Sequence, residues 1–65
     1  MKIIVNGEAQ ETSASTLAAL LGELGKGAAK VATSVNEGFV PKQQRTDHSL
    51  QEGDRVEIVA PRQGG

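Results

Sequence analysis

A short leucine stripe is the feature that most constrains how this 65-residue chain can fold. The leucines follow the i, i+3, i+4, i+7 spacing that places side chains on one face of a helix, and they are Leu17, Leu20, Leu21 and Leu24. Thr16 precedes the stripe as an N-cap residue, and Gly25 follows it where a helix ends in a left-handed residue. We therefore predict one helix over residues 17–24. One amphipathic helix covers one face of one sheet, so the remaining chain has to supply that sheet.

The β-prone segments on both sides of the helix predict the strands. They are residues 2–6, 8–12, 31–35, 39–40 and 55–60. Asn6-Gly7 predicts a type I′ hairpin turn, because both central positions of that turn need a positive φ. Asn36-Glu37-Gly38 predicts a second turn. Residues 42–49 are polar and are predicted to be irregular, with Leu50 anchoring them to the core.

The strongest apolar runs belong to the first and last strands, which we therefore place side by side in the centre of the sheet. The residues expected to face the helix are Ile3, Val5, Val56 and Ile58. Ile4 and Val59 would then point to the uncovered face, with Phe39 nearby, and these three form a candidate partner-docking face. The expected fold class is α+β, with a mixed four- to five-stranded sheet and one main helix packed on one face.

Size and composition narrow the classes of function. A single domain of 6.8 kDa offers little room for a deep active site, which favours a binding or carrier module over an enzyme. The formal net charge is −1 and the one aromatic residue is Phe39, so we expect no nucleic-acid partner. No apolar run is long enough for a membrane span or a signal peptide, so we expect no membrane association and a cytoplasmic location.

The sequence contains no recognisable set of catalytic or metal-ligating residues. It has no cysteine, and its one histidine, His48, lies in a polar segment without partners for a metal site or a catalytic triad. Gly25-Lys26-Gly27 completes neither phosphate-binding glycine motif and is interpreted as a flexible connection. We therefore expect no catalytic residue and no bound metal in this chain.

The C-terminal segment predicts a different kind of site. Residues 1–60 are expected to form the folded domain, with residues 61–65 as a flexible tail because Pro61 cannot continue a strand ladder. The tail ends in Gly64-Gly65, which lack side chains and adopt a wide range of backbone conformations. Such a segment fits a narrow tunnel in another protein and carries a carboxylate into it.

Several segments together resemble the ubiquitin-like β-grasp sulfur carriers, most closely their thiamine-biosynthesis branch, the ThiS family. The matching segments are Ile3-Ile4-Val5-Asn6-Gly7-Glu8, the run from Thr16 to Gly25, Val35-Asn36, Val40-Pro41-Lys42, the run from Gly53 to Val59, and Gly64-Gly65. They cover nearly the whole chain in order. The sequence departs from the pattern at Asn36-Glu37-Gly38, where such proteins often read Asn-Gly directly.

The resemblance implies chemistry on the carboxylate of Gly65. A partner adenylating enzyme of the ThiF type would use ATP and Mg²⁺ to form an acyl-adenylate, while Arg62, Gln63 and Gly64 thread its active site. A sulfur donor such as a cysteine desulfurase would then supply the sulfur of a thiocarboxylate. The loaded carrier would deliver that sulfur to a ThiG-like thiazole synthase. The carrier itself would bind no cofactor and would be a co-substrate, not an enzyme.

Three alternatives remain open at this point. The small subunit of molybdopterin synthase is similar in fold and also ends in Gly-Gly, but such subunits are usually longer and richer in aromatic residues. A ubiquitin-like protein modifier would instead join Gly65 to a lysine. A passive β-grasp interaction module would make no use of its terminal glycines.

Overall fold

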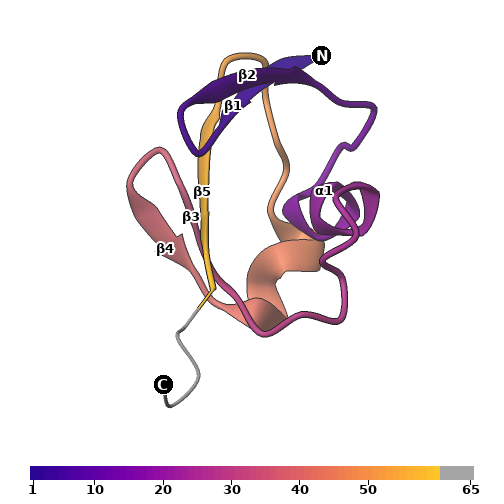
Figure 1. Ribbon diagram of the computed structural model, residues 1–65, viewed down its shortest axis with the longest axis vertical. Helices are drawn as coiled ribbons and strands as arrows, with labels where there is room; N and C mark the ends of the chain where they lie inside the picture. Colours follow the sequence, from indigo (N-terminus) through magenta and orange to yellow (C-terminus); the bar gives the residue numbers. More distant parts are fainter. Residues whose placement is uncertain (61–65) are drawn as a thin grey trace.

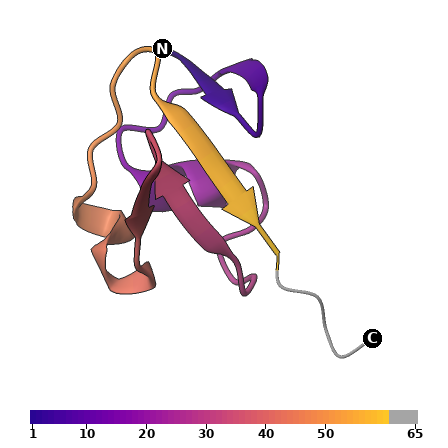
Figure 2. The same ribbon diagram turned by 90° about the vertical axis from the view of Figure 1, so that its left-hand side faces the viewer.

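A mixed five-stranded sheet with one helix on one face makes up the computed structural model, which describes residues 1–60 (Figures 1 and 2). The elements are β1 (Lys2–Val5), β2 (Glu8–Glu11), α1 (Leu17–Glu23), β3 (Ala32–Val35), β4 (Gly38–Val40), the 3₁₀ helix η1 (Lys42–Asp47) and β5 (Arg55–Val59). The strand order is β2-β1-β5-β3-β4. This arrangement confirms the predicted fold class. The predicted tail of residues 61–65 lies outside the described residues.

The first and last strands pair in parallel in the interior of the sheet, as predicted. Ile4 lies opposite Arg55 and Val5 lies opposite Val56. β1 also pairs with β2 in an antiparallel hairpin. The two turn residues of that hairpin, Asn6 and Gly7, have φ values of 50° and 86°, which confirms the predicted Asn-Gly turn.

The second hairpin, between β3 and β4, differs slightly from the prediction. Its turn consists of Asn36 and Glu37, with φ values of 51° and 71°, and Gly38 is already the first residue of β4. A glutamate therefore occupies a left-handed position that usually favours glycine or asparagine. Its carboxylate lies 3.6 Å from the guanidinium of Arg55 on the surface.

Helix α1 has the predicted start and is one residue shorter at its end. The Thr16 hydroxyl accepts a hydrogen bond from the Ala19 amide at 3.2 Å. At the other end, the Gly25 amide donates to the Gly22 carbonyl at 3.1 Å and the Lys26 amide donates to the Leu21 carbonyl at 2.8 Å. These two bonds form a Schellman motif, which explains why Gly25 has a φ of +75°.

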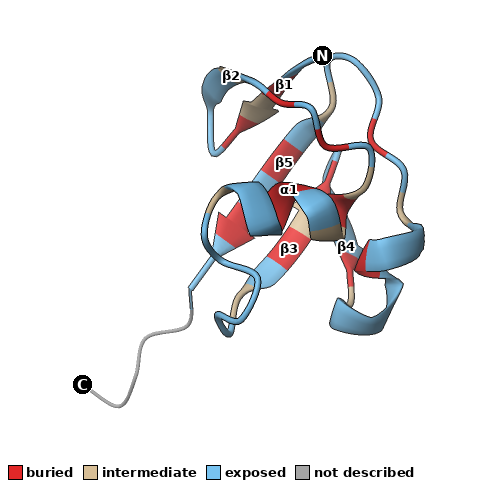
Figure 3. Ribbon diagram, turned by 90° about the vertical axis from the view of Figure 1, so that its right-hand side faces the viewer, coloured by how far each residue is buried: buried red, intermediate tan, exposed pale blue. Residues whose placement is uncertain are grey.

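The core lies between α1 and the inner face of the sheet, as the burial colouring of Figure 3 shows. The helix contributes Leu17, Leu20 and Leu21, each at most 3% exposed. The four predicted strand residues, Ile3, Val5, Val56 and Ile58, are all buried against them. Since complete burial of one such side chain stabilises a fold by about 1.5–3 kcal/mol, this layer supplies most of the hydrophobic stabilisation.

The prediction that residues 42–49 are irregular was wrong. Residues Lys42–Asp47 form η1, and the following segment joins the start of α1 through the Leu17 amide, which donates to the His48 carbonyl at 3.0 Å. Arg45 is 8% exposed, and its Nε and Nη2 donate to the Thr33 hydroxyl (3.0 Å) and the Val31 carbonyl (2.7 Å). A polar sequence thus becomes ordered through contacts with β3. Leu50 is buried, as predicted.

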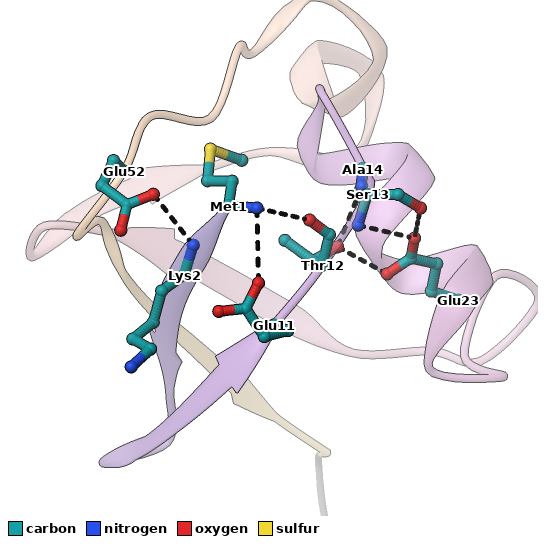
Figure 4. A network of polar contacts seen from close by, with 8 residues as sticks. All are labelled: Met1, Lys2, Glu11, Thr12, Ser13, Ala14, Glu23 and Glu52. Carbon is teal, nitrogen blue, oxygen red and sulfur yellow. Dashed lines mark hydrogen bonds and ion pairs between the residues drawn. The ribbon is translucent and has the colours of Figure 1, made fainter.

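A carboxylate network fastens the β2–α1 connection to the end of the helix (Figure 4). Glu23 accepts hydrogen bonds from the Thr12 hydroxyl at 2.5 Å, the Ser13 hydroxyl at 2.6 Å and the Ser13 amide at 3.2 Å. The hydroxyls of Ser13 and Thr12, in that order, hold the pKa of Glu23 below its ordinary value of 4.5. These bonds favour the ionised form of the carboxyl group.

We predict that this network makes folding stability depend on pH. Because the pKa of Glu23 is lower in the folded than in the unfolded chain, its contribution is fully present above pH 4.5 and is lost as pH falls below that value. In urea titrations between about pH 6 and pH 3, Glu23→Gln should flatten this part of the stability profile. Glu8→Gln, which removes an exposed carboxylate from β2, is the matched control. An unchanged profile for Glu23→Gln would contradict the prediction.

Candidate functional site

The end of β5 is the place from which the chain leaves the sheet. β5 runs away from the N-terminal end of the molecule (Figure 1). On one side its last residues pair with β3, where Ile58 lies opposite Thr33 and Val59 opposite Ala32. On the other side β1 has already ended at Val5, so the ladder on that side needs another source of hydrogen bonds.

The side chain of Asn6 supplies those hydrogen bonds. Its Oδ1 accepts from the Ile58 amide at 2.9 Å, and its Nδ2 donates to the Ile58 carbonyl at 3.2 Å. The carboxamide therefore imitates one more peptide group of β1 and holds both polar groups of Ile58. From the sequence, Asn6 was predicted to end the first strand and begin the turn, with no role for its side chain. The signal that could have revealed its second role is an asparagine directly after a strand that pairs with a longer one.

Asn36 performs the equivalent task at the start of β5. Its Oδ1 accepts from the Arg55 amide at 3.0 Å, and its Nδ2 donates to the Asp54 carboxylate at 3.0 Å. Each hairpin turn thus places an asparagine side chain against one end of the last strand. β5 is held along its full length, and the site from which the chain continues past Val59 has a fixed position.

The three residues of the predicted docking face lie on the uncovered face of the sheet. Phe39 is 70% exposed and Val59 is 60% exposed, whereas Ile4 is half-buried. Phe39 and Val59 lie on strands β4 and β5, on either side of β3. Ile4 on β1 is three strands from Phe39, which corresponds to roughly 14 Å at the usual strand spacing. That a partner protein docks at these three residues remains a prediction.

Polar side chains interrupt this face. Ser34 lies opposite both Phe39 and Glu57, and its hydroxyl donates to the Glu57 carboxylate at 3.5 Å. On β3, the neighbour of Phe39 is therefore the polar Ser34, whereas the neighbour of Val59 is Ala32. The predicted tail residues Arg62, Gln63, Gly64 and Gly65 lie outside the described residues.

The described part of the chain contains no group of three or more His, Asp or Glu side chains placed to hold a metal ion. None of the helices within residues 1–60 is long and apolar enough to cross a membrane. His48 is half-buried and uses its backbone groups to connect η1 to α1.

This fold and site define a β-grasp protein, and the sequence model of the ThiS family matches residues 3–65. The chain belongs to the ThiS family. Its structure superposes on the crystal structure of the thiamine biosynthesis protein ThiS from Geobacter metallireducens with a TM-score of 0.83, at 25% identity and full coverage of both chains. A solution structure of a thiamine biosynthesis protein from the same organism gives a TM-score of 0.79 at 23% identity, covering all of this chain and 88% of the other.

A curated relative provides a second comparison. The chain is 47% identical over 66 residues to a thiazole synthase from Paramagnetospirillum magneticum (strain ATCC 700264 / AMB-1). The alignment covers all of this chain and 20% of the relative. The chain therefore spans about a fifth of the length of the curated relative it matches.

We predict that the Asn6 side chain stabilises the end of β5. Asn6→Gly keeps a residue that tolerates the positive φ but removes both hydrogen bonds to Ile58, so it should lower the free energy of unfolding by about 1–2 kcal/mol. Urea denaturation measures this loss. Hydrogen exchange of the Ile58 amide should accelerate by more than the global loss explains.

Glu37→Gly is the matched control for that experiment. It also places glycine at a left-handed position of a two-residue hairpin turn, but it removes only an exposed ion pair. Its stability should equal or exceed that of the unsubstituted chain. If Asn6→Gly were as stable as this control, the assignment of Asn6 to β5 would be wrong.

Proposed function

We propose that this protein is a sulfur carrier of thiamine biosynthesis, loaded at the carboxylate of Gly65. The observation that carries the proposal is the ThiS family match, which runs through the end of the β-grasp domain to residue 65 and so includes Gly64-Gly65. The structure supports it by holding β5 on both sides up to Ile58, and on the β3 side up to Val59. A fixed starting point lets a partner locate the five residues that follow Ala60.

The chemistry of a carboxylate explains why a carrier needs an activating partner. A carboxylate is negatively charged and resonance-stabilised, so it resists attack by nucleophiles. In the proposed first step, a Gly65 carboxylate oxygen attacks the α-phosphorus of ATP, pyrophosphate leaves and an acyl-adenylate forms. The outer sulfur of a persulfide on a cysteine-desulfurase-type donor then displaces AMP and forms an acyl disulfide, and a thiol reductant cleaves the S–S bond to release the thiocarboxylate. ATP, Mg²⁺ and the catalytic groups belong to the adenylating partner, and the carrier is its substrate.

The proposed acceptor of the sulfur is a thiazole synthase. The relative from Paramagnetospirillum magneticum carries that name, and a fifth of its length corresponds to this chain. A carrier domain within the same polypeptide as the enzyme is consistent with direct delivery between them. Linking two modules raises their effective concentration for one another.

Loading of Gly65 is tested by intact-mass measurement of the 65-residue chain after incubation with ATP, Mg²⁺, the adenylating enzyme and a sulfur source. The expected product is heavier by the replacement of one oxygen with sulfur. Adding a phenylalanine after Gly65 should abolish this product. The terminal residue would then have a bulky side chain, which would not fit the narrow tunnel of the partner. The same residue added before Met1 is the control and should leave loading intact. Equal loading of both extended chains would refute the assignment of Gly65.

We also predict that Phe39 and Val59, the two exposed apolar residues on the uncovered face of the sheet, contribute to partner binding. Phe39→Ser and Val59→Ser should change stability little, because both side chains are mostly exposed. Each should raise the KM for the carrier in the adenylation assay by about tenfold, since an apolar anchor at an interface contributes more than about 1 kcal/mol. Ala19→Ser on the exposed face of α1 is the control. A KM unchanged in both variants would exclude this face from the interface.

A further inference from the structure

A basic depression of about 360 Å³ lies beside the end of β5. It is lined by residues 28–32 and by Lys42 and Arg45 of η1. Ala32 lies directly opposite Val59, so the depression adjoins the point where the chain leaves the sheet. Figures 1 and 2 both show the connection between α1 and β3 next to that end of β5.

The charge of this depression contrasts with that of the whole chain. Its lining contains the cations Lys30, Lys42 and Arg45 and no carboxylate, whereas the formal net charge of the chain is −1. Lys30 and Lys42 are exposed, and neither forms an ion pair within residues 1–60. Their positive charge is not neutralised by the described fold.

Arg45 adds a buried charge to the same place. Two of the five N–H donors that a guanidinium carries are used, on the neutral oxygens of Thr33 and Val31. No carboxylate in the described part of the chain lies within ion-pair distance of it. Every water-inaccessible side-chain nitrogen there has a hydrogen-bond partner, and Nη1 of Arg45 has none, so Nη1 must reach solvent. An anionic partner would form strong, charge-assisted hydrogen bonds with such a guanidinium.

We propose that the basic depression receives a carboxylate side chain of the protein that takes up the chain end. The proposal rests on the proposed function, because it assumes an adenylating partner. Planar guanidinium groups bind carboxylates in a fixed geometry, and Lys30 and Lys42 add attraction at the rim. The volume is near the lower limit for small-molecule pockets and leaves room for an acidic side chain to enter. An acidic residue held there fixes the partner next to Val59.

A direct experiment measures whether the depression binds carboxylates. The ¹⁵N-labelled full chain is titrated with sodium acetate at constant ionic strength, with chloride as the exchanged anion. Amide shifts should move with saturation at residues 28–32 and in η1, and the Arg45 Nε signal should move with them. Shifts that are spread evenly over the chain or that do not saturate would overturn the proposal.

Charge reversal then tests the partner. The doubly substituted chain Lys30→Glu/Lys42→Glu should bind the adenylating enzyme about tenfold more weakly, because each exposed ion pair contributes a factor of a few. Its melting temperature should stay near that of the unsubstituted chain, since both lysines are exposed. Lys26→Glu is the near control, because Lys26 lies in the same connection but does not line the depression. Added salt should weaken the unsubstituted complex more than the doubly substituted one.

The outcomes separate this inference from the proposed function. If the unsubstituted chain is adenylated and the doubly substituted chain binds as tightly as Lys26→Glu, the carboxylate site is wrong and the proposed function stands. If acetate binds but charge reversal leaves partner affinity unchanged, the depression takes a free anion and the proposal is overturned. If the unsubstituted chain is not adenylated at all, the proposed function fails and the partner assignment fails with it.

Discussion

The parallel pairing of β1 with β5 is the interaction on which the rest of this structure depends. Its hydrogen bonds join residues about fifty positions apart, such as the Ile4 amide to the Asp54 carbonyl and the Asn6 amide to the Val56 carbonyl, both at 2.9 Å. Until the last segment takes its place between β1 and β3, neither hairpin has a neighbour for its inner edge. The leucine face of α1 would also lack Val56 and Ile58, two of the residues that cover it.

This topology places a strand that is paired on both sides directly before the segment that we propose to react. A long-range parallel pairing costs loop entropy, which the fold offsets through burial of Val56 and Ile58 and through the two asparagine side chains. The result is a small domain whose end of β5 has one position relative to its surfaces. A partner that binds those surfaces therefore meets the end of β5 at a defined place, as the proposed function requires.

The buried Arg45 shows how a small domain combines structure with recognition. Its hydrogen bonds to Thr33 and Val31 attach η1 to β3, and the Thr33 hydroxyl continues the connection to the Val40 carbonyl at 2.8 Å. Neutral acceptors position the guanidinium without neutralising it. Its remaining charge, together with that of Lys30 and Lys42, therefore stays available at the surface beside Val59.

The sequence by itself determined the elements whose signals are local. The leucine spacing predicted α1, Thr16 and Gly25 predicted its ends, and Asn6-Gly7 predicted the first turn, because each depends on neighbours within a few residues. The segments resembling sulfur carriers predicted the family. Tertiary structure alone decided the order in η1, the burial of Arg45 and the contacts of Asn6 with Ile58. These depend on side chains that come into contact only when distant segments pack together, so no periodic pattern in the sequence predicts them.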